Sequence, residues 1–230
     1  MKNVAYTSEY QNYRNQFDYI FCEKYLTGTR IIELSQEYSI KANIYEDPSS
    51  EVVPYRTHCS TACLLDKSSA TIFSIRNINI DGSFYNLIKH SNGNNYLVFR
   101  IDLYGYSMLD LCTMKDYHYI PEKSFRGGET FIWTGTHYIS NTNLLIAEGC
   151  YWACPYSLFV IDFSNPVNLP YPMFDINDHL DYEDYEDTEF VDWDNTDNLI
   201  IKCNLTEITT TKVIEKDICI KILKSGLSKT

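Results

Sequence analysis

The feature that most restricts the fold of this chain is a weak internal repeat. In three places an aromatic or aliphatic strand is followed by an Asn-rich turn and then by an apolar strand. These places are residues 84–103, 131–149 and 189–205. When the turn residues Asn95, Asn143 and Asn198 are aligned, the repeats lie 48 and 55 residues apart.

Four short strands in about 50 residues are typical of one β-propeller blade. One such meander cannot bury both of its faces alone, so neighbouring units stack face to face. Residues 38–80 offer one more degenerate unit, and residues 206–223 alternate as two final strands. The sequence therefore predicts an all-β fold, a small propeller-like array of about four stacked β-meanders. An ordinary β-sandwich or an irregular meander remains the alternative.

The first 37 residues have a different pattern. Apolar residues at Tyr13, Phe17, Ile20 and Phe21 follow helical spacing, which predicts a short amphipathic helix with Ser8 as its N-cap. A closing strand is the competing prediction for this segment. We expect one domain over residues 1–230, made of an N-terminal segment 1–37, meander repeats 38–223 and a flexible tail 224–230.

The composition predicts a cytoplasmic protein. The N-terminus lacks the apolar stretch of a signal peptide, and no apolar run approaches the ~20 residues that cross a bilayer. Eight cysteines in a chain of this length, without an export signal, are expected to be reduced and mostly buried.

The net charge of −12 is concentrated in one strip. Between Asp175 and Asp197 there are 11 acidic residues and no Lys or Arg, and the rest of the chain carries a net charge of −1. Such a strip repels a phosphate backbone, which argues against direct nucleic-acid binding, and attracts a basic protein surface. A solvated loop is the alternative. Calcium at Asp192 and Asp194 is disfavoured because the EF-hand pattern fails.

Aromatic side chains interleaved with carboxylates are typical of protein-binding surfaces. The predicted partner-binding residues are Tyr182, Glu183, Asp184, Tyr185, Glu186, Asp187, Asp192, Trp193 and Asp194 of the strip, with Tyr151 and Trp152 from a separate turn.

Two cysteine pairs raise the question of a metal site. Cys59 and Cys63, like Cys150 and Cys154, are separated by three residues, and His58 or His137 could complete a zinc site. On a strand, however, residues four apart lie ~13 Å from each other, too far for one ion. We therefore expect buried cysteines and a hairpin that turns near Cys154, with the zinc site as the alternative, and no cofactor.

Motifs for catalysis are missing. The segment around Ser107 lacks the second Gly of a nucleophile elbow, and no phosphate-binding loop, His-Glu-x-x-His or dinucleotide motif occurs. The alternative that remains is a hydrolase of a small nucleotide or sugar. Its site would lie in a central channel near Glu129, His137 and Cys150.

The strings Gly-Glu-Thr-Phe-Ile-Trp, from Gly128, and Gly-Cys-Tyr-Trp-Ala-Cys-Pro-Tyr, from Gly149, carry a resemblance. Over residues 95–170 the chain resembles a group of bacterial cytoplasmic proteins with similar strings and propeller-like repeats. The resemblance implies a shared fold and supplies no activity.

Taken together, these patterns predict a non-enzymatic acidic binding module. Its most concrete form is an inhibitor or immunity-type protein that captures a basic partner through residues 175–197. The hydrolase and a purely structural scaffold are the alternatives, and the oligomeric state cannot be inferred from these patterns.

Overall fold

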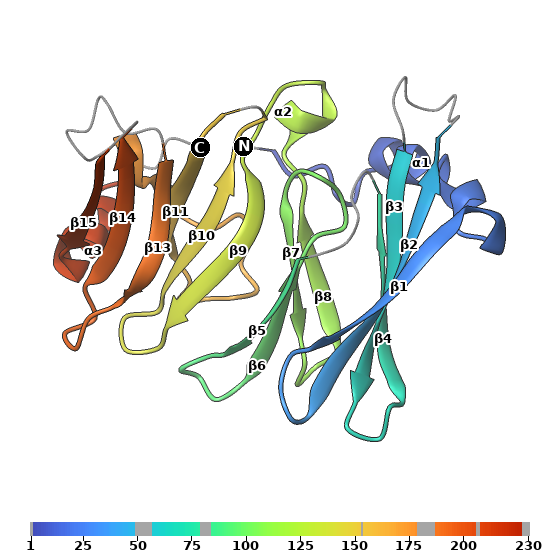
Figure 1. Cartoon of the computed structure of the whole chain (residues 1–230), viewed down its shortest axis with the longest axis horizontal. Coiled ribbons are helices and arrows are strands. Elements are labelled where there is room, and N and C mark those ends of the chain that lie inside the picture. The colour runs from blue at the N-terminus through green and yellow to red at the C-terminus, as the bar shows by residue number, and fades with distance from the viewer. Residues whose placement is uncertain are drawn as a thin grey trace. The chain divides into compact units, whose positions relative to one another are not determined.

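The computed structural model describes residues 2–48, 57–78, 84–152, 154–178, 187–205 and 208–226. Within them the chain forms four antiparallel sheets, and in each sheet every strand is hydrogen-bonded to its neighbours in sequence (Figure 1). The predicted all-β class, with about four meanders and a short N-terminal helix, is confirmed. No described helix is long and apolar enough to span a membrane.

The chain divides into two compact units. The N-terminal unit comprises Lys2–Leu87 and Leu97–Gly128, and the C-terminal unit comprises Ile88–Tyr96 and Glu129–Thr230. The expectation of one domain over residues 1–230 stays a prediction.

The N-terminal unit contains two four-stranded meanders and short helices. Its elements are the helix α1 (Ser8–Asn15), the 3₁₀ helices η1 (Asp18–Ile20) and η2 (Glu23–Tyr25), the strands β1 (Leu26–Glu33), β2 (Tyr38–Asp47), β3 (Thr57–Asp66), β4 (Thr71–Asn77), β5 (Tyr85–Lys89), β6 (Asn95–Phe99), β7 (Tyr106–Asp110) and β8 (Lys115–Tyr119), and the helix α2 (Glu122–Phe125). The tip of the β5–β6 hairpin belongs to the C-terminal unit.

The core of the N-terminal unit lies where its two sheets face each other. Ile40 of β2 is directly opposite Leu64 of β3, and Ala62 is opposite Ile75 of β4, so alternate residues present one apolar face. These residues pack in one buried cluster with Leu97 and other apolar residues of the β5–β8 sheet.

The N-terminal segment is α-helical only at its start. Thr7, not Ser8, is the N-cap of α1, because the Thr7 hydroxyl accepts a hydrogen bond from the backbone N–H of Tyr10 at 3.3 Å. Beyond Asn15 the apolar spacing continues as 3₁₀ turns, and Phe17 and Ile20 are buried there. The competing prediction of a closing strand did not locate β1, because most of its side chains are exposed on both faces and leave no alternation in the sequence.

The C-terminal unit contains one four-stranded and one three-stranded meander. Its elements are the strands β9 (Ile132–Ile139), β10 (Leu144–Cys150), β11 (Tyr156–Asp162) and β12 (Met173–Asp175), the 3₁₀ helix η3 (Ile176–Asp178), the strands β13 (Asp187–Trp193), β14 (Leu199–Leu205) and β15 (Ile208–Ile214), and the helix α3 (Lys216–Lys224). Leu144, Val160, Leu199 and Ile201 meet in its buried cluster.

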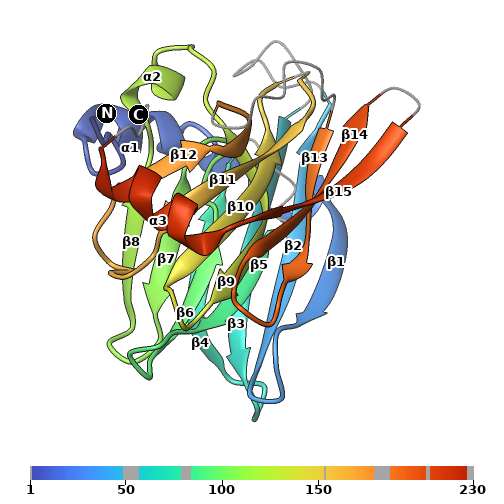
Figure 2. The same ribbon diagram turned by 90° about the vertical axis from the view of Figure 1, so that its left-hand side faces the viewer.

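Of the two final strands predicted over residues 206–223, the first forms β15, but the second is wrong, because this part of the chain forms α3 (Figure 2). Its isoleucines alternate, but Cys219 and Leu223 also share one helical face, and a short apolar segment fits both periods. In its helical form this segment contacts β11 and β12, and Cys219 is buried in the core cluster.

Three hairpin loops share one geometry, and two of them, the loops that begin at His90 and Asp194, lie in the sequence repeat. The loops begin at Asp66, His90 and Asp194, and in each the fourth residue, Ser69, Gly93 or Asp197, has a positive φ. A side-chain acceptor on the first residue binds a backbone N–H two residues later. The loops close at Asn94 and Asn198, so the alignment of Asn95 with Asn198 is wrong by one residue.

Replacement of Gly149 by Ala is expected to destabilise the protein. A Cβ at Gly149 would lie 1.9 Å from the carbonyl oxygen of Ile132, and a backbone atom at a β-bulge cannot move away cheaply. We expect Gly149→Ala to lower the free energy of unfolding by about 1–3 kcal/mol in urea titrations. Gly28→Ala is the control, since a Cβ there meets nothing within 4 Å. Equal effects of the two changes would contradict the packing described.

Candidate functional site

Among the described residues of the C-terminal unit, the most exposed aromatic side chain lies in the turn between β10 and β11. Cys150 pairs with Tyr156 across the hairpin, and the backbone N–H of Cys154 donates to the carbonyl oxygen of Tyr151 at 3.0 Å. The hairpin predicted around Cys154 is thus confirmed. Trp152 is 66% exposed and Tyr156 is 47% exposed, which leaves two large apolar surfaces at this turn.

The acidic strip meets this aromatic turn. The backbone N–H of Tyr156 donates a hydrogen bond of 2.7 Å to the Asp187 carboxylate, and Asp187 is the first residue of β13. The acidic strip and the aromatic turn, which share only their composition in the sequence, are therefore in contact. Tyr182, Glu183, Asp184, Tyr185 and Glu186 lie outside the described residues.

Further carboxylates surround Tyr151. The pKa of Tyr151 is raised first by its burial and then by the negative charges of Asp175, Asp178 and Glu129. Asp175 also holds the local chain, because its Oδ1 accepts hydrogen bonds from the Ser157 hydroxyl at 2.6 Å and from the Asn177 backbone N–H at 3.0 Å. We call this surface the acidic–aromatic end; it comprises Glu129, Tyr151, Trp152, Tyr156, Asp175, Asp178 and Asp187.

The strand β13 extends the acidic surface away from this end. Glu189 and Asp192 are exposed, and Glu189 lies 3.3 Å from the Lys202 ammonium. The opposite face of the strand is apolar, because Phe190 and Trp193 pack against the core cluster. The predicted partner residue Trp193 therefore contributes to packing, whereas Asp192 lies on the exposed side.

Asp194 has a structural task in the β13–β14 turn. Its Oδ1 accepts hydrogen bonds from the backbone N–H groups of Thr196 and Asn198, and its Oδ2 accepts one from the Asn198 side chain. These bonds, of which that from the Asn198 backbone has the largest effect, lower the pKa of Asp194 to about 2. Asp197 in turn accepts hydrogen bonds from Asn141.

His137 pairs with Glu148, a residue that the sequence did not single out. Its Nε2 lies 2.9 Å from Oε2 of Glu148, and its ring stacks on Phe190 with 3.8 Å between centroids. The Phe190 backbone N–H donates to the other Glu148 oxygen at 3.1 Å. The bond to His137 is the main cause that lowers the pKa of Glu148, so this pair links β9 and β10 to β13.

The alternative catalytic set of Glu129, His137 and Cys150 does not converge. His137 is directly opposite Ile146 on β10, and Cys150 is four residues further along that strand, ~13 Å away. Glu129 lies near Tyr151 instead, where its charge acts on the phenol. The expected site for nucleophilic catalysis is therefore not formed by these residues.

The cysteines show no sign of the zinc alternative. Cys59 and Cys63 are both on β3, opposite Tyr45 and Lys41, and no turn brings them together. Cys150 ends β10, and Cys154 lies in the turn that follows. Among the residues that the structure describes, no group of three His, Cys, Asp or Glu side chains is arranged to hold a metal ion. All eight cysteines are described, and none forms a disulfide. The prediction that they are mostly buried is wrong, because only Cys59, Cys203 and Cys219 are buried.

A second polar constellation lies in the N-terminal unit. His118 of β8 has Nδ1 2.9 Å from the Ser107 hydroxyl and Nε2 3.0 Å from the Asp116 carboxylate. A serine nucleophile needs access to its substrate, but Ser107 is 0% exposed. The chain of bonds therefore joins β7 to β8 rather than forming a catalytic triad.

No family model matches the sequence, and no curated protein or solved structure matches the chain. The site must therefore be interpreted from its own geometry.

The Asp194 turn predicts a dependence of stability on pH. The folded-state pKa is about 2 against an ordinary value of 3.8. The stabilisation is therefore present above pH 4 and is lost as the pH falls from about 4 to 2. We expect Asp194→Ala to lower the melting temperature at pH 7 and to flatten the acid side of the stability curve. Asp192→Ala, an exposed neighbour, is the control. An unchanged acid limb in Asp194→Ala would contradict this role.

Proposed function

We propose that the chain is a cytoplasmic, propeller-like binding module of the inhibitor or immunity type, which captures a basic protein partner. The supporting observation is the hydrogen bond from Tyr156 to Asp187, which ties the acidic strip to the aromatic turn of the C-terminal unit. The binding surface in this proposal is the acidic–aromatic end together with the exposed face of β13.

The composition of this surface suits such a partner. Exposed aromatic side chains such as Trp152 and Tyr156 are the anchors that dominate interface energies when they are desolvated. The carboxylates of Asp178, Asp187 and Asp192 would attract a basic surface, speed its association and exclude acidic competitors. Because a phosphate backbone would be repelled, the proposed partner is a protein.

The carboxylates of the strip differ in their exposure and in the structural contacts that they make. Asp194 and Asp197 hold the turn at the far end of β13, and Glu189 is paired with Lys202. Asp178 and Asp192 are exposed, one at the acidic–aromatic end and one on β13. These two residues are therefore the sharpest targets for mutation.

At the proposed site the position of the negative charges, and not only the net charge of the protein, is expected to determine the binding of a basic peptide. The probe is a fluorescein-labelled decalysine peptide, titrated by anisotropy at low salt. The double variant Asp178→Lys/Asp192→Lys is expected to weaken binding at least about tenfold, because it reverses two carboxylates at the site. The matched control Glu23→Lys/Glu33→Lys makes the same net-charge change at exposed positions of the N-terminal unit. Equal losses in both double variants would overturn the proposal.

The contribution of Trp152 to binding is tested against a matched control, Tyr6. Trp152 and Tyr6 are exposed to nearly the same extent, 66% and 64%, but only Trp152 lies at the acidic–aromatic end. We expect Trp152→Ala to weaken binding of the same peptide about fivefold or more by loss of cation–π and apolar contact, and Tyr6→Ala to leave it unchanged. The reverse order would contradict the placement of the site.

A further inference from the structure

The last sheet of the chain has an open edge. Among the described residues this sheet has three strands, in the order β13–β14–β15, whereas each of the other three sheets has four. β15 is the terminal strand, so one of its edges is paired with β14 and the other carries no described strand (Figure 1). The backbone N–H and C=O groups along such an edge are a template on which another strand can form hydrogen bonds.

The hydrogen bonds of the sheet determine which backbone groups of β15 point to this open edge. In a strand, the N–H and C=O of one residue point to one side, and those of the next residue point to the other side. The carbonyl oxygen of Asn198 accepts from the Asp194 backbone N–H at 2.9 Å, so Asn198 faces the β13 side. Leu199 and every second residue after it therefore face β15, where Leu199 is opposite Ile214. The groups that point to the open edge belong to the alternate residues Thr209, Thr211 and Val213.

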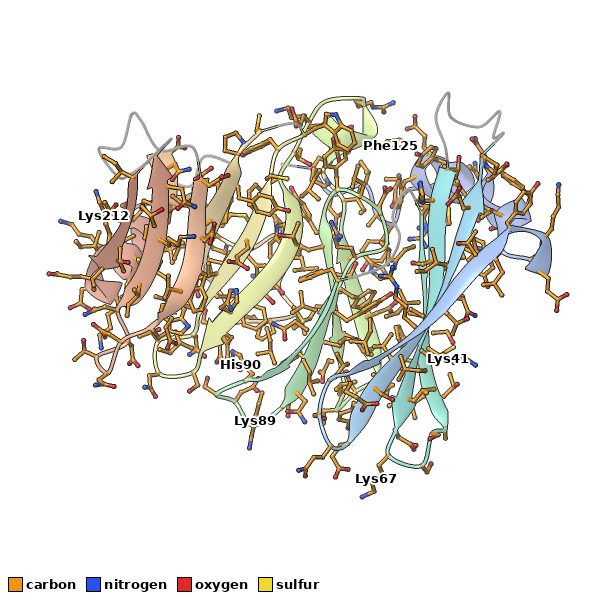
Figure 3. The ribbon with its side chains drawn as sticks, viewed as in Figure 1. Lys41, Lys67, Lys89, His90, Phe125 and Lys212 are labelled. Carbon is orange, nitrogen blue, oxygen red and sulfur yellow. The ribbon has the colours of Figure 1, made fainter. Side chains whose placement is uncertain are left out.

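β15 lacks the features that usually protect an edge strand from pairing. Its seven residues contain no Pro or Gly, and its pairing with β14 runs without a bulge. The pairing of the edge strands β1, β9 and β13, by contrast, is interrupted by an irregularity, and β12 has only three residues. The one charged residue of β15 is Lys212, labelled in Figure 3. It is directly opposite the buried Ile201 of β14, and its side chain is therefore on the inner face of the sheet.

The sequence of β15 is complementary to itself. In an antiparallel pair of two copies centred on Thr211, the strands overlap over their whole length. Val213, which is 58% exposed, would lie opposite Thr209 of the second copy. Ile208, which is 59% exposed, would lie opposite Ile214 of the second copy. Cross-strand pairs of β-branched side chains stabilise antiparallel sheets, so the exposed side chains of the strand would gain cover.

The charge of the strand favours the same register. Centred on Thr211, the pair would place Lys212 opposite Thr210 of the second copy, and the two ammonium groups would not be opposed. A register centred on Lys212 would bring them together, and like charges directly opposite each other are destabilising. β15 contains no carboxylate, although each copy has a net charge of −12. The repulsion between two copies therefore comes from outside the strand and is screened by salt.

We propose that β15 is an interface between two copies of this chain, in which the two strands pair antiparallel about Thr211. The pairing would join two three-stranded sheets into one of six strands and bond the backbone groups that point to the open edge. The inference goes beyond the proposed function. It leaves β13, at the other edge of the same sheet, available to a basic partner.

Sedimentation equilibrium of the full-length protein tests the self-association. A single strand pair is small for an interface, so we expect a monomer–dimer equilibrium with a Kd of about 100 µM or tighter, measured from about 10 to 500 µM protein. Raising NaCl from about 50 to 500 mM is expected to tighten the dimer at least about threefold, because it screens the net negative charge. Binding of a basic peptide at the acidic–aromatic end would weaken under the same change, which distinguishes the two surfaces. A monomer at every concentration would overturn the proposal and leave the edge to a strand of a different protein.

A proline on β15 locates the interface. The N–H of Thr211 points away from β14, so Thr211→Pro removes a bond to the second copy without removing one within the sheet. We expect Thr211→Pro to weaken the dimer at least about tenfold, whereas Thr211→Val, which keeps the N–H and the branched shape, should leave it unchanged. A folded Thr211→Pro variant that dimerises like the unmodified protein would overturn the proposal.

A charge on the exposed face of β15 provides a second variant if Thr211→Pro does not fold. Val213→Asp is expected to weaken the dimer at least about tenfold, because it removes the apolar contact with Thr209 and adds a carboxylate to each copy. Val191→Asp is the matched control, since Val191 is a similarly exposed valine, at 48%, on β13 of the same sheet. Equal effects of the two substitutions would overturn the placement of the interface on β15.

Discussion

Burial of one face of each meander against a second sheet is the constraint on which both units depend. A meander of three or four antiparallel strands has one apolar face that cannot remain in water, and the two sheets of each unit supply cover for each other. This pairing fixes the register of every strand, because a slip by one residue would turn side chains such as Leu64 or Ile201 outward. The outward faces are then available for polar and charged residues, including those of β13.

The same register decides what each carboxylate does. Asp194 begins a hairpin loop, and both of its carboxylate oxygens accept hydrogen bonds within the turn. Asp192, two residues earlier, lies on the exposed face of β13. Glu148 faces His137 on the neighbouring strand and accepts a hydrogen bond from Phe190. A high density of acidic residues in the sequence is therefore divided between structure and surface, and only the second group can attract a basic partner.

The repeat and its turns could be predicted from sequence, since Asn-rich loops between apolar strands are local signals. The strand β1 and the helix α3 were missed for opposite reasons. The exposed β1 has no alternation, and the apolar residues of α3 fit two periods. The pairs His137–Glu148 and His118–Ser107 depend on cross-strand register, which the sequence alone does not fix, so the candidate site had to be taken from composition. Composition singled out Trp152 and Asp187, which lie in segments that the structure brings into contact. It could not separate from them Asp194 and Trp193, which stabilise the turn and pack against the core.

The proposed contact between a basic partner and the acidic–aromatic end can be followed at the tryptophan side chains. The chain has three tryptophans, and their indole N–H signals in a ¹H–¹⁵N spectrum report on three environments: Trp152 on the exposed turn, Trp193 beside the core cluster and Trp133 in the interior at 2% exposure. Titration with a lysine-rich peptide is predicted to shift the Trp152 signal in a saturable, salt-sensitive way while the Trp133 signal stays in place. A peptide that binds while the Trp152 signal does not move would contradict the account.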